Sequence, residues 1–195
     1  MIDQRGRSWL TKHIVSPIGK VLVRLRISAS MVTTLGLLVT LAGAVILANG
    51  HPITGGLVLG LGGGIDGVDG TVARLTGTAS RRGAFLDTIF DRIGEVAMFA
   101  GLAWFVSDDS LLVLLTVIAL GNSMLIPYVR SKAEAEGLDG KGGIMGRAER
   151  IILFCGLIIP VGWGWWGAEV MLWPMVVLTG LTVVQRYWKA WVALG

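Results

Sequence analysis

The stretch from Ile27 to Ile65 contains no Asp, Glu, Lys or Arg. An apolar run of about 20 residues is enough for a helix to cross a bilayer, and this stretch is long enough to cross twice. The sequence Asn49-Gly50-His51-Pro52 interrupts it, and glycine and proline favour a turn. The stretch therefore predicts two membrane-spanning helices joined by a short turn.

Four more apolar stretches follow, at 83–106, 110–129, 150–166 and 170–188. The composition agrees with them, since 53% of the residues are hydrophobic and only 15% are charged. No repeat, low-complexity tract or linker divides the chain. The sequence thus predicts an all-α integral membrane protein, a single domain over residues 1–195 in which residues 27–195 form six transmembrane helices.

The first 26 residues are polar and basic, and no cleavable signal sequence is apparent. Apolar residues recur on one helical face of this segment, with most of its basic residues on another. The apolar face consists of Leu10, Ile14, Ile18, Val21, Leu22 and Leu25. We expect an amphipathic helix over 1–26, kinked near Pro17, that lies in the headgroup layer of the membrane. A disordered basic segment is the alternative.

Basic residues are distributed unevenly among the connections between the predicted spans. They precede the first span and follow the second, fourth and last, whereas the turn at 49–52 has none and the next outer connection carries Asp108 and Asp109. Because basic loops face the cytoplasm, both termini should lie on the cytoplasmic side of the cell membrane. The net charge of +4 then reflects contacts with membrane lipids and phosphorylated substrates, and nucleic acid is not expected as a partner.

Four aspartates lie within the apolar sequence, at Asp66, Asp69, Asp87 and Asp91. On helices the first two are spaced i,i+3 and the last two i,i+4, so each pair shares a face and the two faces can meet. An Asp in hydrocarbon costs about 2.5–3.5 kcal/mol on insertion scales, and four together repel one another. One or two divalent ions would keep them ionised, and oxygen ligands favour Mg²⁺ or Mn²⁺ over Zn²⁺.

The residues around these acids indicate a substrate that carries a diphosphate. Arg74 and the hydroxyl of Ser80 flank the acids, and Mg²⁺ commonly leaves coordination positions for phosphate oxygens. Asp91 is the acid most easily placed against an acceptor alcohol, from which it could take a proton. Close approach of a neighbouring helix or of a bulky ligand is favoured by Gly62, Gly63, Gly64, Gly67 and Gly70.

The two acidic segments resemble the signature D-x-x-D-G-x-x-A-R…G-x-x-x-D-x-x-x-D of the CDP-alcohol phosphatidyltransferases. Every signature position is met, first from Asp66 to Arg74 and, eight residues later, from Gly83 to Asp91. The resemblance implies transfer of a phosphatidyl group from CDP-diacylglycerol to an alcohol, with release of CMP, by a membrane enzyme that is commonly a homodimer. It also implies metal ions, two per site, bound to Asp66, Asp69, Asp87 and Asp91, with Asp91 as the base. The CDP portion would contact Gly70, Ala73, Arg74, Ser80 and Gly83.

The acceptor alcohol is indicated by the second half of the chain. The segments 128–137 and 143–150, together with Gln185-Arg186, are similar to the phosphatidylinositol phosphate synthases of actinobacteria and their archaeal relatives. That resemblance implies that the phosphate of inositol 1-phosphate is bound by Arg130, Lys132, Arg147, Arg150 and Arg186. Independently of the resemblance, several cationic groups that converge at a membrane cavity favour a dianionic ligand, because leaving them unpaired is costly.

The chain departs from those enzymes at three places. Pro127 precedes Tyr128, Arg130 comes before Lys132, and Gly146 replaces the acid that usually precedes the next arginine. Since Arg and Lys are not equivalent hydrogen-bonding groups, glycerol 3-phosphate or another phosphorylated polyol is the second candidate acceptor. The alternative interpretation of the basic residues after the fourth span is that they only mark a cytoplasmic loop.

Two other classes of function stay open at this point. Ion-coupled transporters also carry acids within their spans, but no inverted repeat is visible here and the acids adjoin an arginine-bearing loop. A catalytically inactive scaffold is disfavoured because all four aspartates are present. Glu95 continues the helical face of Asp87 and Asp91, and we expect it to have a structural role as a partner of Arg92 or Arg74.

Overall fold

The computed structural model describes residue 24 and residues 28–76 and 80–195, and for residues 68–71 and 74–76 it describes the backbone alone. The predicted amphipathic helix over 1–26 lies outside the described residues. The described part contains six helices and no strand. They are α3 (Ala29–Ala48), α4 (Pro52–Thr76), α5 (Arg81–Phe105), α6 (Ser110–Ala135), α7 (Arg147–Gly162) and α8 (Glu169–Leu194).

The helices begin and end where local sequence signals favour it. The Ser28 hydroxyl accepts a hydrogen bond from the backbone N–H of Met31, and the Asp109 carboxylate accepts from the N–H of Leu111, so both are N-caps. Between α3 and α4, Gly50 has a φ of 82°, and Pro52 is the first residue of α4, a position where its missing N–H is not needed. The predicted turn at 49–52 is therefore present.

Three of the six helices, α3, α6 and α8, are long and apolar enough to cross a membrane. Two others, α4 and α5, have 25 residues each but carry the charged groups of the acidic segments. The helix α7 has 16 residues, which corresponds to a length of about 24 Å and is less than the roughly 30 Å of a hydrocarbon core. The prediction of an all-helical chain is confirmed, and three of its expected spans have the length and composition of membrane helices.

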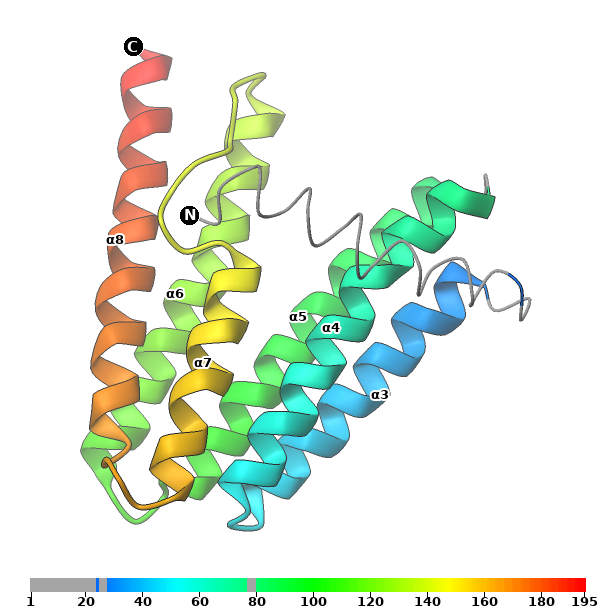
Figure 1. The fold of residues 1–195 in the computed structure, drawn as a ribbon. Coiled ribbons are helices and arrows are strands. Elements are labelled where there is room, and N and C mark those ends of the chain that lie inside the picture. Colours follow the sequence, from blue (N-terminus) through cyan, green and yellow to red (C-terminus); the bar gives the residue numbers. More distant parts are fainter. Residues whose placement is uncertain (1–23, 25–27, 77–79) are drawn as a thin grey trace.

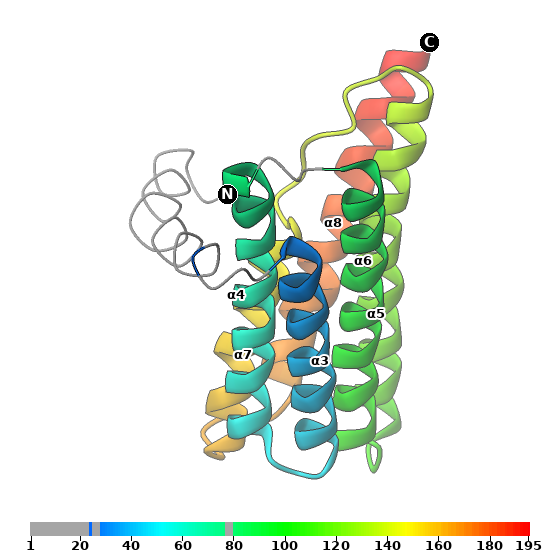
Figure 2. The same ribbon diagram turned by 90° about the vertical axis from the view of Figure 1, so that its right-hand side faces the viewer.

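The bundle consists of two groups of helices that are joined by the packing of α5 against α6 and by α7 (Figures 1 and 2). In one group α3 packs against both α4 and α5. In the other group α6 packs against α8. The helix α7 contacts α4 on one side and α8 on the other, so its side chains can reach both groups.

The helix α4 lies very close to its neighbours because glycines form its contact surfaces. A Cβ atom added to Gly62 would lie 2.9 Å from the backbone nitrogen of Thr40 on α3, and one added to Gly63 would lie 3.2 Å from the Ile151 side chain on α7. A Cβ on Gly64 would meet nothing within 4 Å. The close contacts fix α4 between α3 and α7 just one turn before Asp66.

The distribution of side chains is that of a protein that faces lipid. Large apolar side chains point outward, such as Trp104, which is 72% exposed, and Leu61, which is 63% exposed. The interior instead contains the charged side chain of Arg150, which is 1% exposed. The exposed large apolar side chains fit a membrane protein, whereas the buried Arg150 is paired with an acid, as a buried arginine is in any fold.

Candidate active site

Three aspartates from two helices meet within the bundle, ten residues before α4 ends at Thr76 and six and ten residues after α5 begins at Arg81. Asp66 comes from α4, and Asp87 and Asp91 come from successive turns of α5. One carboxylate oxygen from each of them lies within 4.8 Å of the other two. The fourth predicted ligand, Asp69, is in the part of α4 whose side chains are not described.

The chemistry of this cluster fits a hard divalent cation. All of its donors are carboxylate oxygens, which Mg²⁺ and Mn²⁺ prefer and Zn²⁺ does not. Oδ1 of Asp91 is buried and accepts no hydrogen bond from the described residues. A buried acceptor without a donor is costly, and a divalent ion held by Asp66, Asp87 and Asp91 would compensate this oxygen.

Arg147 brings a positive charge into the cluster from a third helix. It is the first residue of α7, its guanidinium donates a hydrogen bond to Asp66, and Nη1 also lies 2.7 Å from Oδ1 of Asp91. The contact with Asp91 is an ion pair rather than a hydrogen bond, because no N–H is aligned with Oδ1. Arg147 was predicted to bind the acceptor phosphate, and in the structure it contacts two of the predicted metal ligands.

Arg150, one turn further along α7, belongs to a buried ionic network instead of facing an open site. Its Nε and Nη2 lie 2.7 and 2.6 Å from Oε1 of Glu95, and its Nη1 donates to the carbonyl of Met145 at 3.4 Å. Oε2 of Glu95 accepts a hydrogen bond from Arg92. The network joins α5 to α7. The expected partner Arg92 is therefore present, whereas Arg150 was not predicted as a partner of Glu95.

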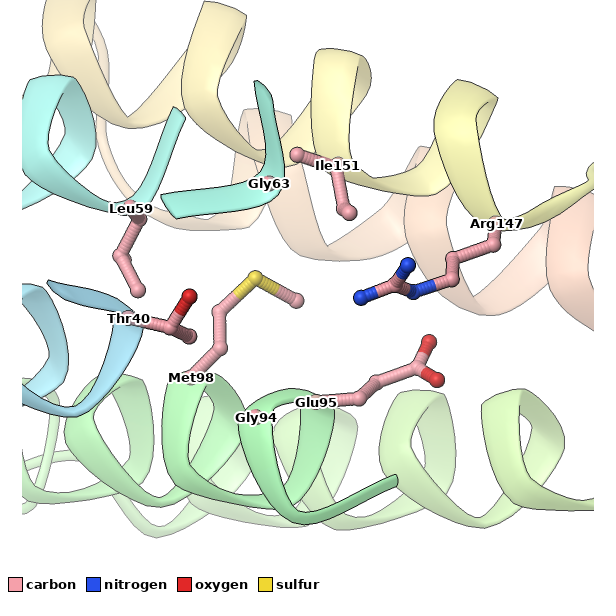
Figure 3. Close-up of a pocket in the computed structure, with 8 residues that line it drawn as sticks. All are labelled: Thr40, Leu59, Gly63, Gly94, Glu95, Met98, Arg147 and Ile151. Carbon is pink, nitrogen blue, oxygen red and sulfur yellow. The ribbon is translucent and has the colours of Figure 1, made fainter. Parts of the chain in front are cut away.

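A small cavity lies beside the cluster, between α3, α4, α5 and α7 (Figure 3). Arg147 and Glu95 face each other at one end of it, and Met98 and Leu59 close the other end. The two glycines Gly63 and Gly94 line its walls. The cavity is thus polar on the side of the aspartates and apolar on the side of the bundle interior.

The remaining basic residues of the predicted acceptor site also have protein partners. Nε and Nη1 of Arg186 donate to the carbonyls of Gly142 and Ile126 at 2.9 and 2.8 Å. Arg130 pairs with Glu134 at 2.8 Å. Arg186 lies close enough to both Arg130 and Arg150 to interact with their charges.

Lys132 lies apart from this group. Its ammonium donates to Glu136 at 2.8 Å, and its side chain is 66% exposed. Two residues along a helix correspond to a rotation of about 200°, so Arg130 and Lys132 leave nearly opposite sides of α6. The sequence predicted both as phosphate ligands, but α6 remains helical through Ala135, so the two side chains point in different directions.

The loop before α7 is fixed to α8 by side chains that sequence analysis did not identify. The N–H of Met145 donates to the Thr182 hydroxyl at 3.0 Å, and the N–H of Ile144 donates to Gln185 at 3.1 Å. Thr and Gln are common on helices, and nothing in their local pattern signals a contact with a loop about 40 residues earlier. These bonds set the position at which α7, and hence Arg147, begins.

A third contact fixes the same loop from its exposed side. Lys189 donates a hydrogen bond to Asp139 at 2.9 Å, and this bond holds the pKa of the Asp139 carboxyl below its usual range. A carboxyl whose pKa is lowered by folding stabilises the fold above its unfolded pKa, and the contribution is lost as the pH falls through the lowered value. The contact is therefore complete at neutral pH.

The residues predicted to contact CDP lie where α4 ends and α5 begins. The Ser80 hydroxyl caps α5 by accepting a hydrogen bond from the N–H of Gly83 at 3.1 Å. Ala73 is half-buried in α4. Gly70 and Arg74 belong to the same helix, for which only the backbone is described at these two positions. These residues thus lie on the same two helices as the aspartates.

Comparison with known proteins identifies relatives over nearly the whole chain. The family model described as CDP-alcohol phosphatidyltransferase matches residues 26–188. A phosphatidylinositol phosphate synthase from Mycobacteroides abscessus is 36% identical over 179 residues, which cover 89% of this chain and 81% of that protein. The similarity therefore extends well beyond the acidic signature.

Solved structures of a Mycobacterium tuberculosis phosphatidylinositol phosphate synthase have the same fold. Its complex with manganese and citrate superposes with a TM-score of 0.84 at 34% identity, and covers 91% of this chain and 89% of that one. Its structure with CDP-DAG bound has a TM-score of 0.83 at 35% identity, and covers 91% and 94% of the two chains. The helical arrangement in Figure 1 is thus shared with a metal-binding, CDP-DAG-binding protein.

Proposed function

The chain belongs to the CDP-alcohol phosphatidyltransferase family, and from this premise we propose that it transfers the phosphatidyl group of CDP-diacylglycerol to inositol 1-phosphate and releases CMP. The observation that carries the proposal is the meeting of Asp66, Asp87 and Asp91 within 4.8 Å, next to Arg147. Carboxylates that can hold divalent ions and a cation that can hold a phosphate are the two requirements of this reaction.

We assign the binding of two divalent ions, Mg²⁺ or Mn²⁺, to Asp66, Asp69, Asp87 and Asp91. When bound, such ions neutralise the diphosphate and make its phosphorus easier to attack. The end of α4 and the start of α5 would hold the cytidine diphosphate, through Gly70, Ala73, Arg74, Ser80 and Gly83. Asp66 and Asp87 lie on the same two helices, which supports this assignment.

Asp91 is proposed as the base of the reaction. It takes the proton of the acceptor hydroxyl as that oxygen attacks the phosphorus that carries the lipid, and the bond from this phosphorus to the oxygen of CMP breaks. Positioned proton transfer of this kind requires an acceptor atom that is not engaged by other donors. Oδ1 of Asp91 accepts no hydrogen bond from the described residues, and release of its ion pair with Arg147 would leave this oxygen open to the acceptor hydroxyl.

The acceptor phosphate is assigned to the basic residues that the second group of helices supplies. Arg186 lies within electrostatic reach of both Arg130 and Arg150, and Arg147 contacts Asp66 and Asp91. Lys132 is also assigned to the acceptor phosphate, although its side chain is 66% exposed on α6 and pairs with Glu136. The name of the relatives, phosphatidylinositol phosphate synthase, favours inositol 1-phosphate over glycerol 3-phosphate.

We propose that this enzyme is a single domain with six membrane spans and that it lies in the cell membrane. Both termini and the active site would face the cytoplasm. The predicted spans alternate with basic inner connections, and CDP-diacylglycerol would be reached from that side. We further propose a homodimer, which the mass of the purified protein in detergent tests directly. A reporter fused to the C-terminus that is active only in the cytoplasm tests the orientation.

The function is tested by CMP release from CDP-diacylglycerol with the purified full chain and Mg²⁺ or Mn²⁺. Four acceptors are compared: inositol 1-phosphate, glycerol 3-phosphate, inositol and serine. We expect release with inositol 1-phosphate and none with the two acceptors that lack a phosphate. Release with glycerol 3-phosphate alone would replace the acceptor and keep the reaction, and no release with any acceptor would reject the reaction.

A further inference from the structure

Arg147 engages the same carboxylates that would hold the divalent ions. Its guanidinium donates to Asp66 and lies 2.7 Å from Oδ1 of Asp91, and both acids belong to the ligand cluster. A guanidinium and a divalent cation therefore compete for the same oxygens. When the ion binds, Arg147 loses two partners and gains a positive neighbour.

The described part of the cavity lining contains no acid that lacks a partner and could receive the displaced guanidinium. Among the described residues that line this cavity, Glu95 is the one acid (Figure 3). Its Oε1 is occupied by Arg150 and its Oε2 by Arg92. Glu149, on the same turn of α7, lies against the start of its own helix, since a Cβ on Gly146 would be 2.6 Å from its Oε2.

A displaced Arg147 therefore needs an anion from the substrates. The Arg147 side chain is 31% exposed, so it is partly withdrawn from water, and leaving its charge unpaired there is costly. A planar guanidinium matches two phosphate oxygens at once. The Arg147 guanidinium is thus bound to the metal ligands until an ion displaces it, and it can then bind a phosphate.

We propose that Arg147 exchanges from Asp66 and Asp91 to a substrate phosphate when a divalent ion binds, so that the ion and the phosphate bind cooperatively. The inference rests on the proposed function and adds to it a positioning residue that couples two ligands. Coupling of this kind is reciprocal: a bound phosphate that captures Arg147 must raise the affinity for the ion by the same factor. The phosphate can be that of the acceptor or the diphosphate of CDP-diacylglycerol.

The test measures Mn²⁺ binding, by the electron paramagnetic resonance signal of free Mn²⁺, to the full chain in detergent. Wild type and Arg147→Gln are titrated alone, with inositol 1-phosphate, and with CDP after correction for Mn²⁺ bound by CDP itself. Lys141→Gln, which removes one positive charge from the exposed loop, is the charge-matched control. Arg147→Lys keeps the positive charge but lacks the planar guanidinium group. It replaces Arg147→Gln in the titrations if the glutamine variant does not fold.

Without a phosphate, Arg147→Gln should bind Mn²⁺ about fivefold or more tightly than wild type, and Lys141→Gln should match wild type. In wild type a phosphate should tighten Mn²⁺ binding by about fivefold or more, and this enhancement should fall below about twofold in Arg147→Gln and be reduced in Arg147→Lys. The phosphate that produces the enhancement, inositol 1-phosphate or CDP, is the partner in the exchange.

Equal Mn²⁺ affinity in wild type and Arg147→Gln would overturn the competition. An enhancement that persists in the variant, or that neither phosphate produces in wild type, would overturn the exchange. These readouts are independent of turnover. Failure of CMP release with every acceptor would reject the proposed function while leaving the Mn²⁺ titrations to decide the exchange.

Discussion

Arg150 and Glu95 form an ion pair in the interior of the bundle, with two guanidinium nitrogens of Arg150 at 2.7 and 2.6 Å from a single oxygen of Glu95. The two side chains are 2% and 5% exposed. Because the pair joins α5 to α7, it holds the helix that carries Arg147 against the helix that carries Asp87 and Asp91.

Glu95→Gln should strongly destabilise the protein. The substitution keeps the shape of the side chain but leaves Arg150 as a buried charge without its counter-ion, a change that costs about 3–5 kcal/mol. Unfolding of the purified protein in mixed detergent measures the loss. Glu134→Gln breaks the exposed pair with Arg130 and should cost less than about 1 kcal/mol. Equal losses in the two variants would contradict the role of the buried pair.

Gly62→Ala and Gly64→Ala should differ sharply although they are two residues apart on one helix. A Cβ at Gly62 would lie 2.9 Å from the backbone nitrogen of Thr40, whereas a Cβ at Gly64 would meet nothing within 4 Å. The first variant should lose about 1–3 kcal/mol through overpacking. The second should be neutral or gain up to about 1 kcal/mol, since alanine favours a helix. Thermal unfolding in detergent compares them, and equal midpoints would show that α3 and α4 pack less closely than described.

Asp91→Asn should lower the kcat of CMP release by about a hundredfold or more, because an amide cannot accept the proton of the acceptor hydroxyl. The assay is run at saturating Mn²⁺ so that weaker ion binding does not limit the rate. Asp108→Asn, at the exposed end of the connection between α5 and α6, should leave kcat unchanged. A variant of Asp91 that binds nucleotide and turns over normally would remove the assignment of the base.

Removal of divalent ions with EDTA should abolish CMP release. Added Mg²⁺ or Mn²⁺ should restore it, since the described ligand set consists of carboxylates and such sets select hard cations. Zn²⁺ should restore little or nothing, because it prefers nitrogen and sulfur ligands. Activity that persists in EDTA after dialysis would contradict a metal-dependent reaction.

Gly143→Ala should disturb the loop before α7 more than Gly137→Ala does. Both glycines have positive φ angles, 85° and 79°, so each alanine pays about 1–2 kcal/mol of backbone strain. At Gly143 the added Cβ would also lie 2.5 Å from the Thr182 side chain, while at Gly137 it would meet nothing within 4 Å. We expect the KM for the acceptor to rise in Gly143→Ala, and steady-state kinetics of CMP release in both variants measures the difference.

The parts of the fold and of the site that depend on local spacing could be predicted from the sequence. The turn at 49–52 followed from Gly50 and Pro52, and the shared face of Asp87 and Asp91 followed from their i,i+4 spacing. The cost of carboxylates in apolar sequence indicated that they would meet, and Asp66 is found with them. The predicted span ended at residue 129, just before the first charged residue, whereas α6 continues to Ala135 and ends just before Gly137, whose φ is 79°.

Contacts between distant segments could not be predicted in the same way. Glu95 finds Arg150 55 residues away, and nothing in the local sequence of either residue favours this partner over Arg74 or Arg92. The position of Arg147 depends on the bonds that Thr182 and Gln185 make to the loop. Such contacts follow from how α7 and α8 pack, and packing is not encoded in the spacing of any one helix.

The arrangement in which contacts of α5 with α6, and of α7 with α4 and α8, link the α3–α5 group to the α6–α8 pair suggests how proteins of this type can diversify. The acids that would handle the reacting diphosphate lie in the first group, whereas Arg130, Arg186 and the anchors of the loop lie on α6 and α8. New acceptors can therefore be recruited by exchanging residues of the second group while the reaction itself is conserved. A chimera that takes α6, the loop and α8 from a relative would inherit its choice of alcohol as one module.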